Sequence, residues 1–422
     1  MGPLFFRDRL GGADAAWLHM EEPTNPMVVN ALLELGGRLD FGQFLGIVER
    51  MVSAAPHFRA RVAEGRLGLG VPHWEPDPHF ELSRHVERVL IDEGEAALRS
   101  FIGERLGTQL EISRPLWRFY VIERDHENTI LLCRIHHSIA DGFALMGLLL
   151  SLCDEHAPTR VREVTRGFRP GRVPEQAASL ARLVTLLPDP KTQLKKPLSN
   201  AKRVAWTRPI PLGEVKAVAH ALSATVNDVL VSVVAGALRT FLHAHGDTVD
   251  QVRAMVPVNL RVLSGSTNDL GNQFGLVILG LPVGIGEPIS RVFETSHRMN
   301  RLKSSPEAVV TLAVLRAMGW APNLVEHLGV SFFGSKCSLV LTNVPGPRER
   351  LHLCGVPLDR LLFWVPQSAR MGLGISIFSY ANEVTIGVLS DAAVLAEPQV
   401  VADALEAELA LLIGAVAVSR RS

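Results

Sequence analysis

Apolar residues recur along the chain with two different periods, which indicates alternating strands and helices. Short runs rich in Val, Ile and Leu, at 27–35, 129–135 and 339–344, have the length and composition of buried strands. Longer segments at 94–106 and 289–302 are predicted as helices. Because both halves of the chain mix strands with covering helices, we expect an α/β fold, or an α+β fold in two layers.

Three of the predicted helices have recognisable features. Asp40 is a suitable N-cap for a helix that carries apolar residues along one side. Thr225, followed three positions later by Asp228, has the spacing of a capping box before the long apolar helix 225–242. The last helix, 398–415, is amphipathic, and we expect it to pack into the core because a helix seated in a membrane carries more basic residues.

The regular pattern is interrupted between residues 157 and 200, where prolines and basic residues recur around a single predicted helix, 175–187. A chain of 422 residues is too long for one ordinary core. We therefore interpret residues 1–157 and 201–422 as two subdomains, and residues 158–200 as the crossover linker between them.

Composition excludes some classes of function. Lys plus Arg and Asp plus Glu number 43 each, so the net charge is zero, which argues against a nucleic-acid-binding protein. The four cysteines lie far apart without the spacing of a zinc site, and we interpret them as reduced thiols. We find no uncharged apolar run long enough to span a bilayer, so we expect any membrane contact to be peripheral.

The stretch 133–142 holds the strongest candidate chemistry, because a buried strand ends there in two adjacent histidines and an Asp-Gly turn. Side chains alternate along a strand, so His136 and His137 should point to opposite sides, and only one can face a given cavity. A neutral imidazole can take a proton from a hydroxyl. The alternative is one core histidine and one surface histidine without chemistry. Asp141 either holds the turn or pairs with an arginine.

These residues also carry a resemblance to a known family. Residues 136–142 match the HHxxxDG motif of acyltransferases related to chloramphenicol acetyltransferase and to peptide-synthetase condensation domains. Three further segments resemble motifs of the bacterial wax ester synthase/diacylglycerol acyltransferase family: PLW at 115–117, ND at 227–228 and NVPGP at 343–347. The resemblance implies two chloramphenicol acetyltransferase-like subdomains, with a tunnel between them and the histidine pair at its centre.

The resemblance implies direct transfer of a long-chain acyl group from acyl-CoA, a co-substrate rather than a cofactor, to a long-chain alcohol or a diacylglycerol. His137 would be the general base, and Asn227 is a candidate oxyanion donor. We assign His136 and Asp141 to architecture. We consider Ser138 and Cys133 weak candidates for a nucleophile. Ser138 lacks an oriented base of its own. The residues expected to bind substrate are Gly142, Pro115, Leu116, Trp117, Asn343, Pro345 and Gly346, although Trp117 reads more readily as a packing residue.

Two alternatives stay open at this point. One is a condensation-type acyltransferase that makes another ester or an amide; the ND and NVPGP segments and the absence of carrier-protein domains from this sequence favour the lipid family instead. The other is a non-catalytic lipid-binding relative, against which the intact HHxxxDG motif argues. Basic residues of the linker either contact the phosphates of coenzyme A or belong to a solvated connection. We expect a cytoplasmic protein, either free or peripheral on the inner membrane face or on lipid inclusions.

Overall fold

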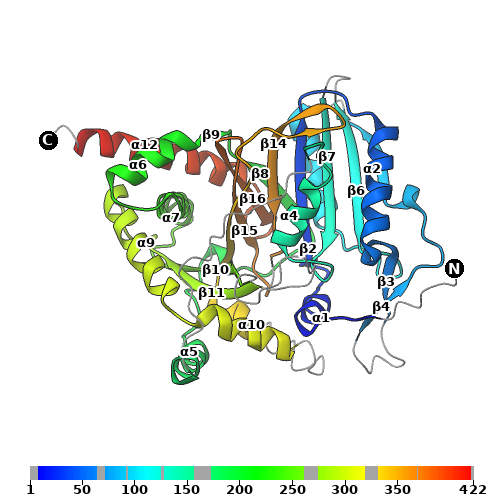
Figure 1. Ribbon diagram of the computed structural model, residues 1–422. Helices are drawn as coiled ribbons and strands as arrows, with labels where there is room; N and C mark the ends of the chain where they lie inside the picture. The colour runs from blue at the N-terminus through cyan, green and yellow to red at the C-terminus, as the bar shows by residue number, and fades with distance from the viewer. Residues whose placement is uncertain are drawn as a thin grey trace.

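The computed structural model describes residues 8–63, 72–91, 94–124, 128–155, 173–260, 274–318, 331–367 and 369–419. Two lobes lie side by side, each built on one large mixed sheet (Figure 1). This arrangement confirms the predicted mixed fold of strands and covering helices. A third, small sheet contains β1 (Asp8–Arg9), β4 (His73–Pro76) and β3 (Ala60–Ala63).

The six-stranded sheet of the first lobe presents the histidine pair at the end of a central strand. Its spatial order is β13 (His352–Leu353), β14 (Val356–Trp364), β2 (Val28–Leu35), β7 (Asn128–His136), β6 (Trp117–Arg124) and β5 (Val86–Leu90). Helices α2 (Phe41–Ala54) and α3 (Gly94–Leu106) lie alongside it, and both were predicted. The Asp40 carboxylate accepts the backbone N–H of Gln43 at 2.9 Å, which confirms the predicted cap.

Two strands of this sheet come from the second half of the chain. β14 pairs antiparallel with β2 from Leu358↔Leu35 to Trp364↔Asn30, and β13 pairs with β14. The sequence-based division into 1–157 and 201–422 is therefore wrong for residues 352–364, which the sequence analysis did not identify as strands. The apolar run 361–364 fits this place because it is buried against both lobes.

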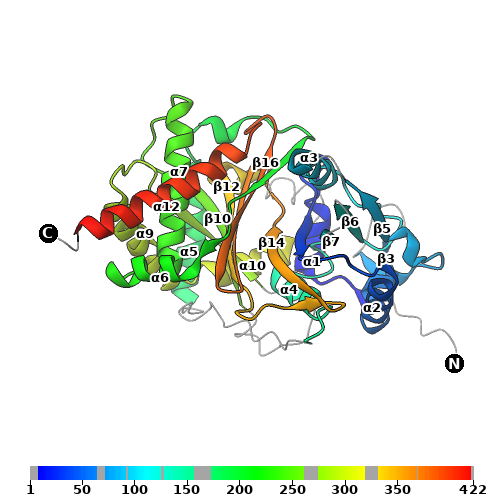
Figure 2. The same ribbon diagram turned by 90° about the horizontal axis from the view of Figure 1, so that it is seen from above.

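The second lobe is built on a sheet covered by long helices. Its strands follow the spatial order β11 (Phe274–Leu281), β10 (Val252–Asn259), β12 (Leu339–Pro345), β15 (Leu373–Tyr380), β16 (Glu383–Asp391) and β8 (Lys202–Trp206), with β9 (Ile210–Pro211) also paired to β16. Figure 2 shows helices gathered on the outer side of this sheet, among them α6 (Leu212–Ala221), α7 (Val226–Ala244), α9 (Pro288–Lys303) and α12 (Gln399–Ser419).

The predicted features of these helices are confirmed. The Thr225 hydroxyl accepts the N–H of Asp228 at 3.1 Å, and the Asp228 carboxylate accepts the N–H of Thr225 at 3.0 Å, so the capping box is complete. α7 is long and apolar enough to cross a membrane by length and composition alone, but 72% of the tested stretch is buried inside the fold. α12 buries Val401, Leu405, Leu409 and Leu412, so the predicted amphipathic helix packs into the core.

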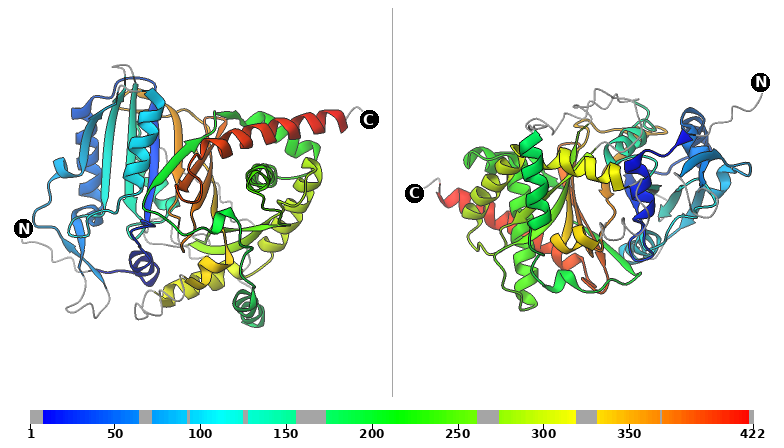
Figure 3. Two further views of the ribbon diagram at one scale, coloured as in Figure 1. Left: turned by 180° about the vertical axis from the view of Figure 1, so that it is seen from behind. Right: turned by 90° about the horizontal axis from the view of Figure 1, so that it is seen from below.

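The described part of the linker belongs to the second lobe. α5 spans Val173–Thr185, close to the predicted 175–187, and Leu194 is buried in the core of the second lobe. Residues 158–172, with five of the eight basic positions of the linker (Arg160, Arg162, Arg166, Arg169 and Arg172), lie outside the described residues. Below the sheets, α1 (Gly12–His19) of the first lobe lies against α10 (Glu307–Met318) of the second (Figure 3).

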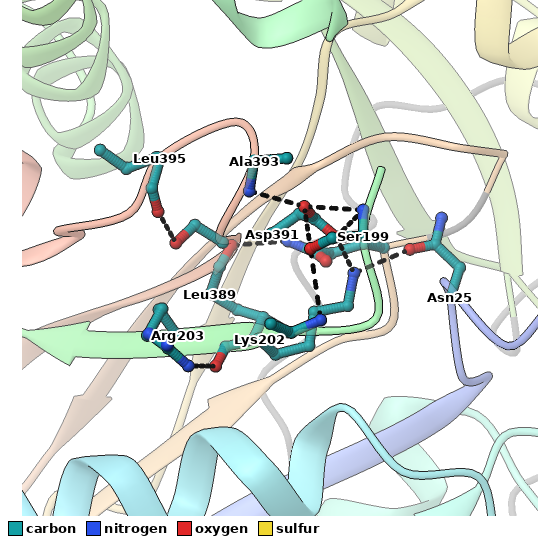
Figure 4. Close-up of polar contacts among 11 residues, drawn as sticks. Asn25, Ser199, Lys202, Arg203, Leu389, Asp391, Ala393 and Leu395 are labelled. Carbon is teal, nitrogen blue, oxygen red and sulfur yellow. Dashed lines mark hydrogen bonds and ion pairs between the residues drawn. The ribbon is translucent and has the colours of Figure 1, made fainter. Parts of the chain in front are cut away.

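A buried polar cluster also joins the lobes. Lys202 Nζ at the edge of the second sheet lies 3.2 Å from Asp391 Oδ2, and it donates to Asn25 Oδ1 of the first lobe at 3.3 Å (Figure 4). The Asp391 carboxylate also accepts from Ser199 N, Ser199 Oγ and Ala393 N, at 2.9 to 3.0 Å. Lys202 and Asp391 are 2% and 0% exposed, so this ion pair is fully desolvated.

Candidate active site

A largely apolar cavity lies between the two lobes and has His137 in its wall. The cavity measures about 770 Å³ when the solvent space at its opening is counted. Both lobes supply lining residues: Trp17, Val29, His137, Asp141, Gly142 and Met146 from the first half of the chain, and Met255, Pro257, Phe274, Leu276, Val340, Thr342, Val344, Phe363, Val365, Pro366, Ser376, Ile377 and Phe378 from the second. The resemblance implied a site between the halves, and the cavity occupies that position.

His137 is held by aromatic rings and by its own backbone. It follows the last residue of β7, and its N–H donates to the carbonyl of Met27 at 2.8 Å. The imidazole stacks on Trp17 with centroids 4.3 Å apart and planes inclined by 20°, and Phe274 lies 5.4 Å away. The side chain is 5% exposed, so its imidazole works in a site from which bulk water is largely excluded.

His136 occupies a different environment, as the alternation of side chains predicts. It is fully buried, and its Nδ1 accepts the backbone N–H of Ser138 at 3.1 Å. An accepting Nδ1 leaves the ring proton on Nε2, which lies 3.7 Å from the Glu21 carboxylate. His136 is not among the residues that line the cavity, so its surroundings suit an architectural role.

The two candidate nucleophiles lie outside the cavity wall. The expectation that Ser138 lacks an oriented base is wrong, because its Oγ lies 2.7 Å from His136 Nδ1. Both partners are nonetheless buried away from the cavity, at 2% and 0% exposure. Burial raises the pKa of the Cys133 thiol well above its ordinary value, which keeps it protonated and unreactive.

Asp141 and Gly142 form the start of α4 (Gly142–Leu150) at the edge of the cavity. The Asp141 carboxylate accepts the N–H of Ala144 at 2.9 Å as the N-cap of this helix. This bond supports the interpretation that Asp141 holds the turn. Gly142 contributes open space, because a Cβ built there meets no atom within 4 Å. Both residues line the cavity.

The PLW segment lies in the core of the first lobe. Trp117 is 1% exposed, its Nε1 donates to the carbonyl of Phe58 at 2.9 Å, and its ring stacks on His85 at 4.6 Å. The packing interpretation of Trp117 is therefore confirmed. Pro115, Leu116 and Trp117 do not line the cavity, so their assignment as substrate contacts finds no support there. The segment acts on the site through the backbone, because the Leu116 carbonyl accepts the N–H of His136 at 2.9 Å.

The NVPGP segment meets the cavity through residues other than the predicted one. Along β12, Val340, Thr342 and Val344 face the cavity, so alternation turns Asn343 away from it. Asn343 Nδ2 instead donates to Asn227 Oδ1 at 2.7 Å, which joins two of the motifs. Neither asparagine lines the cavity, and the oxyanion role of Asn227 stays a prediction.

Pro345 and Gly346 shape the wall of the cavity without lining it. The N–H of Gly346 donates to the carbonyl of Ser379 at 2.7 Å, across the turn at the end of β12. A Cβ at Gly346 would lie 2.5 Å from Cζ of Phe378, a wall residue, and 2.6 Å from the Ser379 carbonyl. Glycine is therefore required by close approach, and its effect on substrate is indirect.

Comparison with known families agrees with this geometry. Residues 10–176 match the wax ester synthase/diacylglycerol acyltransferase catalytic domain, and residues 270–413 match the WS/DGAT C-terminal domain. The chain belongs to the wax ester synthase/diacylglycerol acyltransferase family. It is thus an acyltransferase of that family, as its motifs predicted.

Relatives extend over nearly the whole chain. A Mycobacterium tuberculosis protein provisionally named as a diacylglycerol O-acyltransferase is 28% identical, over 91% of this chain and 86% of its own length. The wax ester synthase/diacylglycerol acyltransferase from Marinobacter aquaeolei VT8 shares the fold at a TM-score of 0.73 and 23% identity, covering 97% of this chain and 100% of that one. The first condensation domain of the calcium-dependent antibiotic synthetase shares it at a TM-score of 0.64 and 16% identity, covering 98% and 96%.

In this acyltransferase, the sequence analysis identified His137, Asp141 and Gly142 among the wall residues and missed the others, which include Trp17, Phe274, Thr342 and Ser376. Trp17 lies on a helix that is buried on nearly every side, so periodicity gives it no special position. Thr342 adjoins the quoted motif, and alternation from Asn343 would have placed it on the opposite face. Among the described residues, no group of three or more His, Cys, Asp or Glu side chains is arranged to hold a metal ion.

Proposed function

We propose that the protein transfers a long-chain acyl group from acyl-CoA to the hydroxyl of a long-chain alcohol or a diacylglycerol. The observation that carries this proposal is the position of His137, a proton acceptor in the wall of a cavity whose other lining is mostly aliphatic and aromatic. Such a cavity suits a hydrocarbon chain and excludes water, which would otherwise compete with the alcohol for the thioester.

Space for the hydrocarbon extends beyond the cavity itself. A second apolar cavity of about 380 Å³ shares Trp17, Met255 and Leu276 with the first, and its other lining residues are Met20, Thr311, Leu315, Met318, Phe333 and Ala369. The two spaces therefore adjoin each other across these three side chains. The presence of a second apolar space beside the first supports a long-chain donor.

His137 acts as the general base in the proposed reaction. Its imidazole takes the hydroxyl proton while the alcohol oxygen attacks the thioester carbon, so the C–O bond forms as the carbonyl becomes an oxyanion. The oxyanion then collapses and the C–S bond breaks. The imidazolium returns its proton to the departing thiolate, which leaves an ester and free coenzyme A. Stacking on Trp17 orients the ring, so no reorganisation is needed at the moment of reaction.

Direct transfer predicts that no acyl-enzyme forms and that both substrates bind before chemistry. The enzyme would be incubated with radiolabelled palmitoyl-CoA alone, denatured, and assayed for covalent label. Absence of label together with intersecting double-reciprocal plots is the expected result. A stoichiometric label on a serine, threonine or cysteine, with parallel plots, would refute direct transfer.

The activity is tested with purified protein and palmitoyl-CoA, offered hexadecanol, dioleoylglycerol and hexadecylamine in separate reactions. Ester formation with either hydroxyl acceptor is expected, and an amide product alone would favour the condensation alternative. His137→Ala and His137→Asn should each lower kcat by about two to four orders of magnitude, the range of general-base catalysis. His220→Ala, which removes an exposed histidine of α6, is the matched control.

We further propose that the protein works in the cytoplasm, free or peripherally attached to the inner membrane face or to lipid inclusions. The burial of α7, the helix that passes the length test for a membrane span, supports peripheral attachment. Cell fractionation tests this proposal. Release from membranes by salt or carbonate is the expected result, and a strict requirement for detergent contradicts it.

A further inference from the structure

The second-lobe wall of the cavity carries two buried hydroxyl groups, on Thr342 of β12 and Ser376 of β15. These side chains are 3% and 4% exposed. β12 and β15 pair in parallel, and Thr342 and Ser376 are Cα partners in that register. Register partners leave a sheet on the same face, with their strands about 4.8 Å apart. The two side chains therefore stand beside each other in the same cavity as His137, which belongs to the first lobe.

Neither hydroxyl forms a hydrogen bond with any of the described residues. Their neighbours in the second-lobe wall are apolar, among them Met255, Val340 and Val344. Neither oxygen is among the fully buried atoms that lack a partner, so both hydroxyls are open to the cavity, where valine or alanine would present apolar atoms instead. Two adjacent unbonded hydroxyls in an otherwise apolar wall point to a ligand that accepts their hydrogen bonds.

The proposed reaction creates such an acceptor. We propose that Thr342 and Ser376 donate hydrogen bonds to the oxygen of the thioester carbonyl as it becomes an oxyanion. This inference rests on the function proposed above. As the alcohol oxygen bonds to the carbonyl carbon and His137 takes its proton, the negative charge develops on the carbonyl oxygen. The two hydroxyls stabilise that charge until the C–S bond breaks and the carbonyl re-forms.

The other polar side chains near the cavity are less suited to this role. Asn227 lies outside the cavity wall, where its Oδ1 accepts from Asn343. Asp141 lines the cavity, but its carboxylate is an acceptor that caps α4. His137 is the base. Among the described side chains of the cavity wall, Thr342 and Ser376 are the hydroxyl donors. Trp17 Nε1 is a further N–H without a hydrogen-bond partner among the described residues, on the ring that stacks on His137.

The test removes each hydroxyl with little change of shape, in Thr342→Val, Ser376→Ala and the double variant. Loss of one oxyanion donor typically lowers kcat by about 10²–10³-fold, so losses of that order are expected with little change in the dissociation constant for palmitoyl-CoA. The double variant covers the case in which one hydroxyl substitutes for the other. Melting temperatures should stay unchanged or rise, because the removed groups have no protein partner.

Matched controls separate the hydroxyl from the shape of the wall. Thr342→Ser and Ser376→Thr keep the hydroxyl and should retain kcat within about tenfold, less than the loss of a full donor. His220→Ala, which lies on α6 outside the cavity wall, should also retain kcat. Loss of kcat together with a lower melting temperature in the removing and the conserving variants alike would show a structural role and overturn the inference.

The outcomes also distinguish this inference from the proposed function. If the wild-type protein forms ester and the double variant keeps most of its kcat, the oxyanion role is wrong and the proposed function stands. If the wild-type protein forms ester with neither hexadecanol nor dioleoylglycerol, the proposed function falls and this inference falls with it. A covalent acyl label on Ser376 or Thr342 would make that residue a nucleophile and overturn the oxyanion role.

Discussion

Replacing Asp391 with alanine should deprive a buried lysine of its counter-charge and weaken the junction between the lobes. Lys202 Nζ lies 3.2 Å from Asp391 Oδ2, and its other hydrogen-bond partner among the described residues is Asn25 Oδ1, at 3.3 Å. Removing one partner of a buried ion pair costs about 3–5 kcal/mol. The entropy of unfolding is about 0.9 kcal/mol per kelvin for a chain of this length, so the melting temperature should fall by about 3–6 °C.

Lys202→Met is the informative companion variant, because Lys202 and Asp391 differ in the hydrogen bonds that they form besides their ion pair. Without Lys202, the Asp391 carboxylate keeps the N–H and hydroxyl of Ser199 and the N–H of Ala393 as donors. Methionine also fills the space of the lysine stem. We therefore expect a smaller loss of stability for Lys202→Met than for Asp391→Ala. Thermal unfolding followed by circular dichroism measures both, and the reverse ranking would refute the reasoning.

The loss of stability caused by Asp391→Ala should also depend on pH. Burial already lowers the pKa of Lys202, and Asp391 opposes that shift. Without Asp391, the folded state releases the lysine proton at a lower pH, while the unfolded chain holds its proton up to about 10.4. Stability of the variant therefore rises with pH between these two values, more than that of the wild type. The difference in melting temperature between the wild type and Asp391→Ala should be smaller at pH 9.5 than at pH 7, and an unchanged difference would contradict a charge effect.

Three further predictions concern other parts of the molecule. Asp141→Ala should destabilise the protein by about 0.5–2 kcal/mol through the lost cap of α4, whereas Asp141→Asn keeps an acceptor for Ala144 and should retain most of that stability in urea unfolding. Gly346→Ala should cost about 1–3 kcal/mol in the same assay, because its Cβ would displace Phe378 or the Ser379 backbone. Burial raises the pKa of Glu307, so the stability that its protonated form contributes is lost as pH rises from 4.5 through that raised pKa. Glu307→Gln has no such carboxyl group, and it should gain stability over the wild type across this pH window. Melting curves recorded from pH 4 to 8 measure the difference.

The sequence by itself determined most local elements and the chemical nature of the site. Helix α3 begins and ends at the predicted residues, and α9 differs from its predicted range by one residue at each end, because their apolar spacing and their breakers lie within the segments themselves. The alternation of a strand was enough to separate the surroundings of His136 from those of His137. The PLW, ND and NVPGP motifs, together with the histidine pair, indicated the family that the comparisons show.

Only the tertiary structure decided which residues meet around His137. Trp17 is 120 positions earlier in the chain, yet its ring stacks on this imidazole. Strand β14 joins the sheet of the first lobe from the second half of the chain, and Thr342 stands beside Ser376 through a strand register. Local periodicity tells which face of an element is apolar, but not which element lies opposite that face. Strand order, register and the packing of distant segments set those contacts, and they depend on burying the whole chain at once.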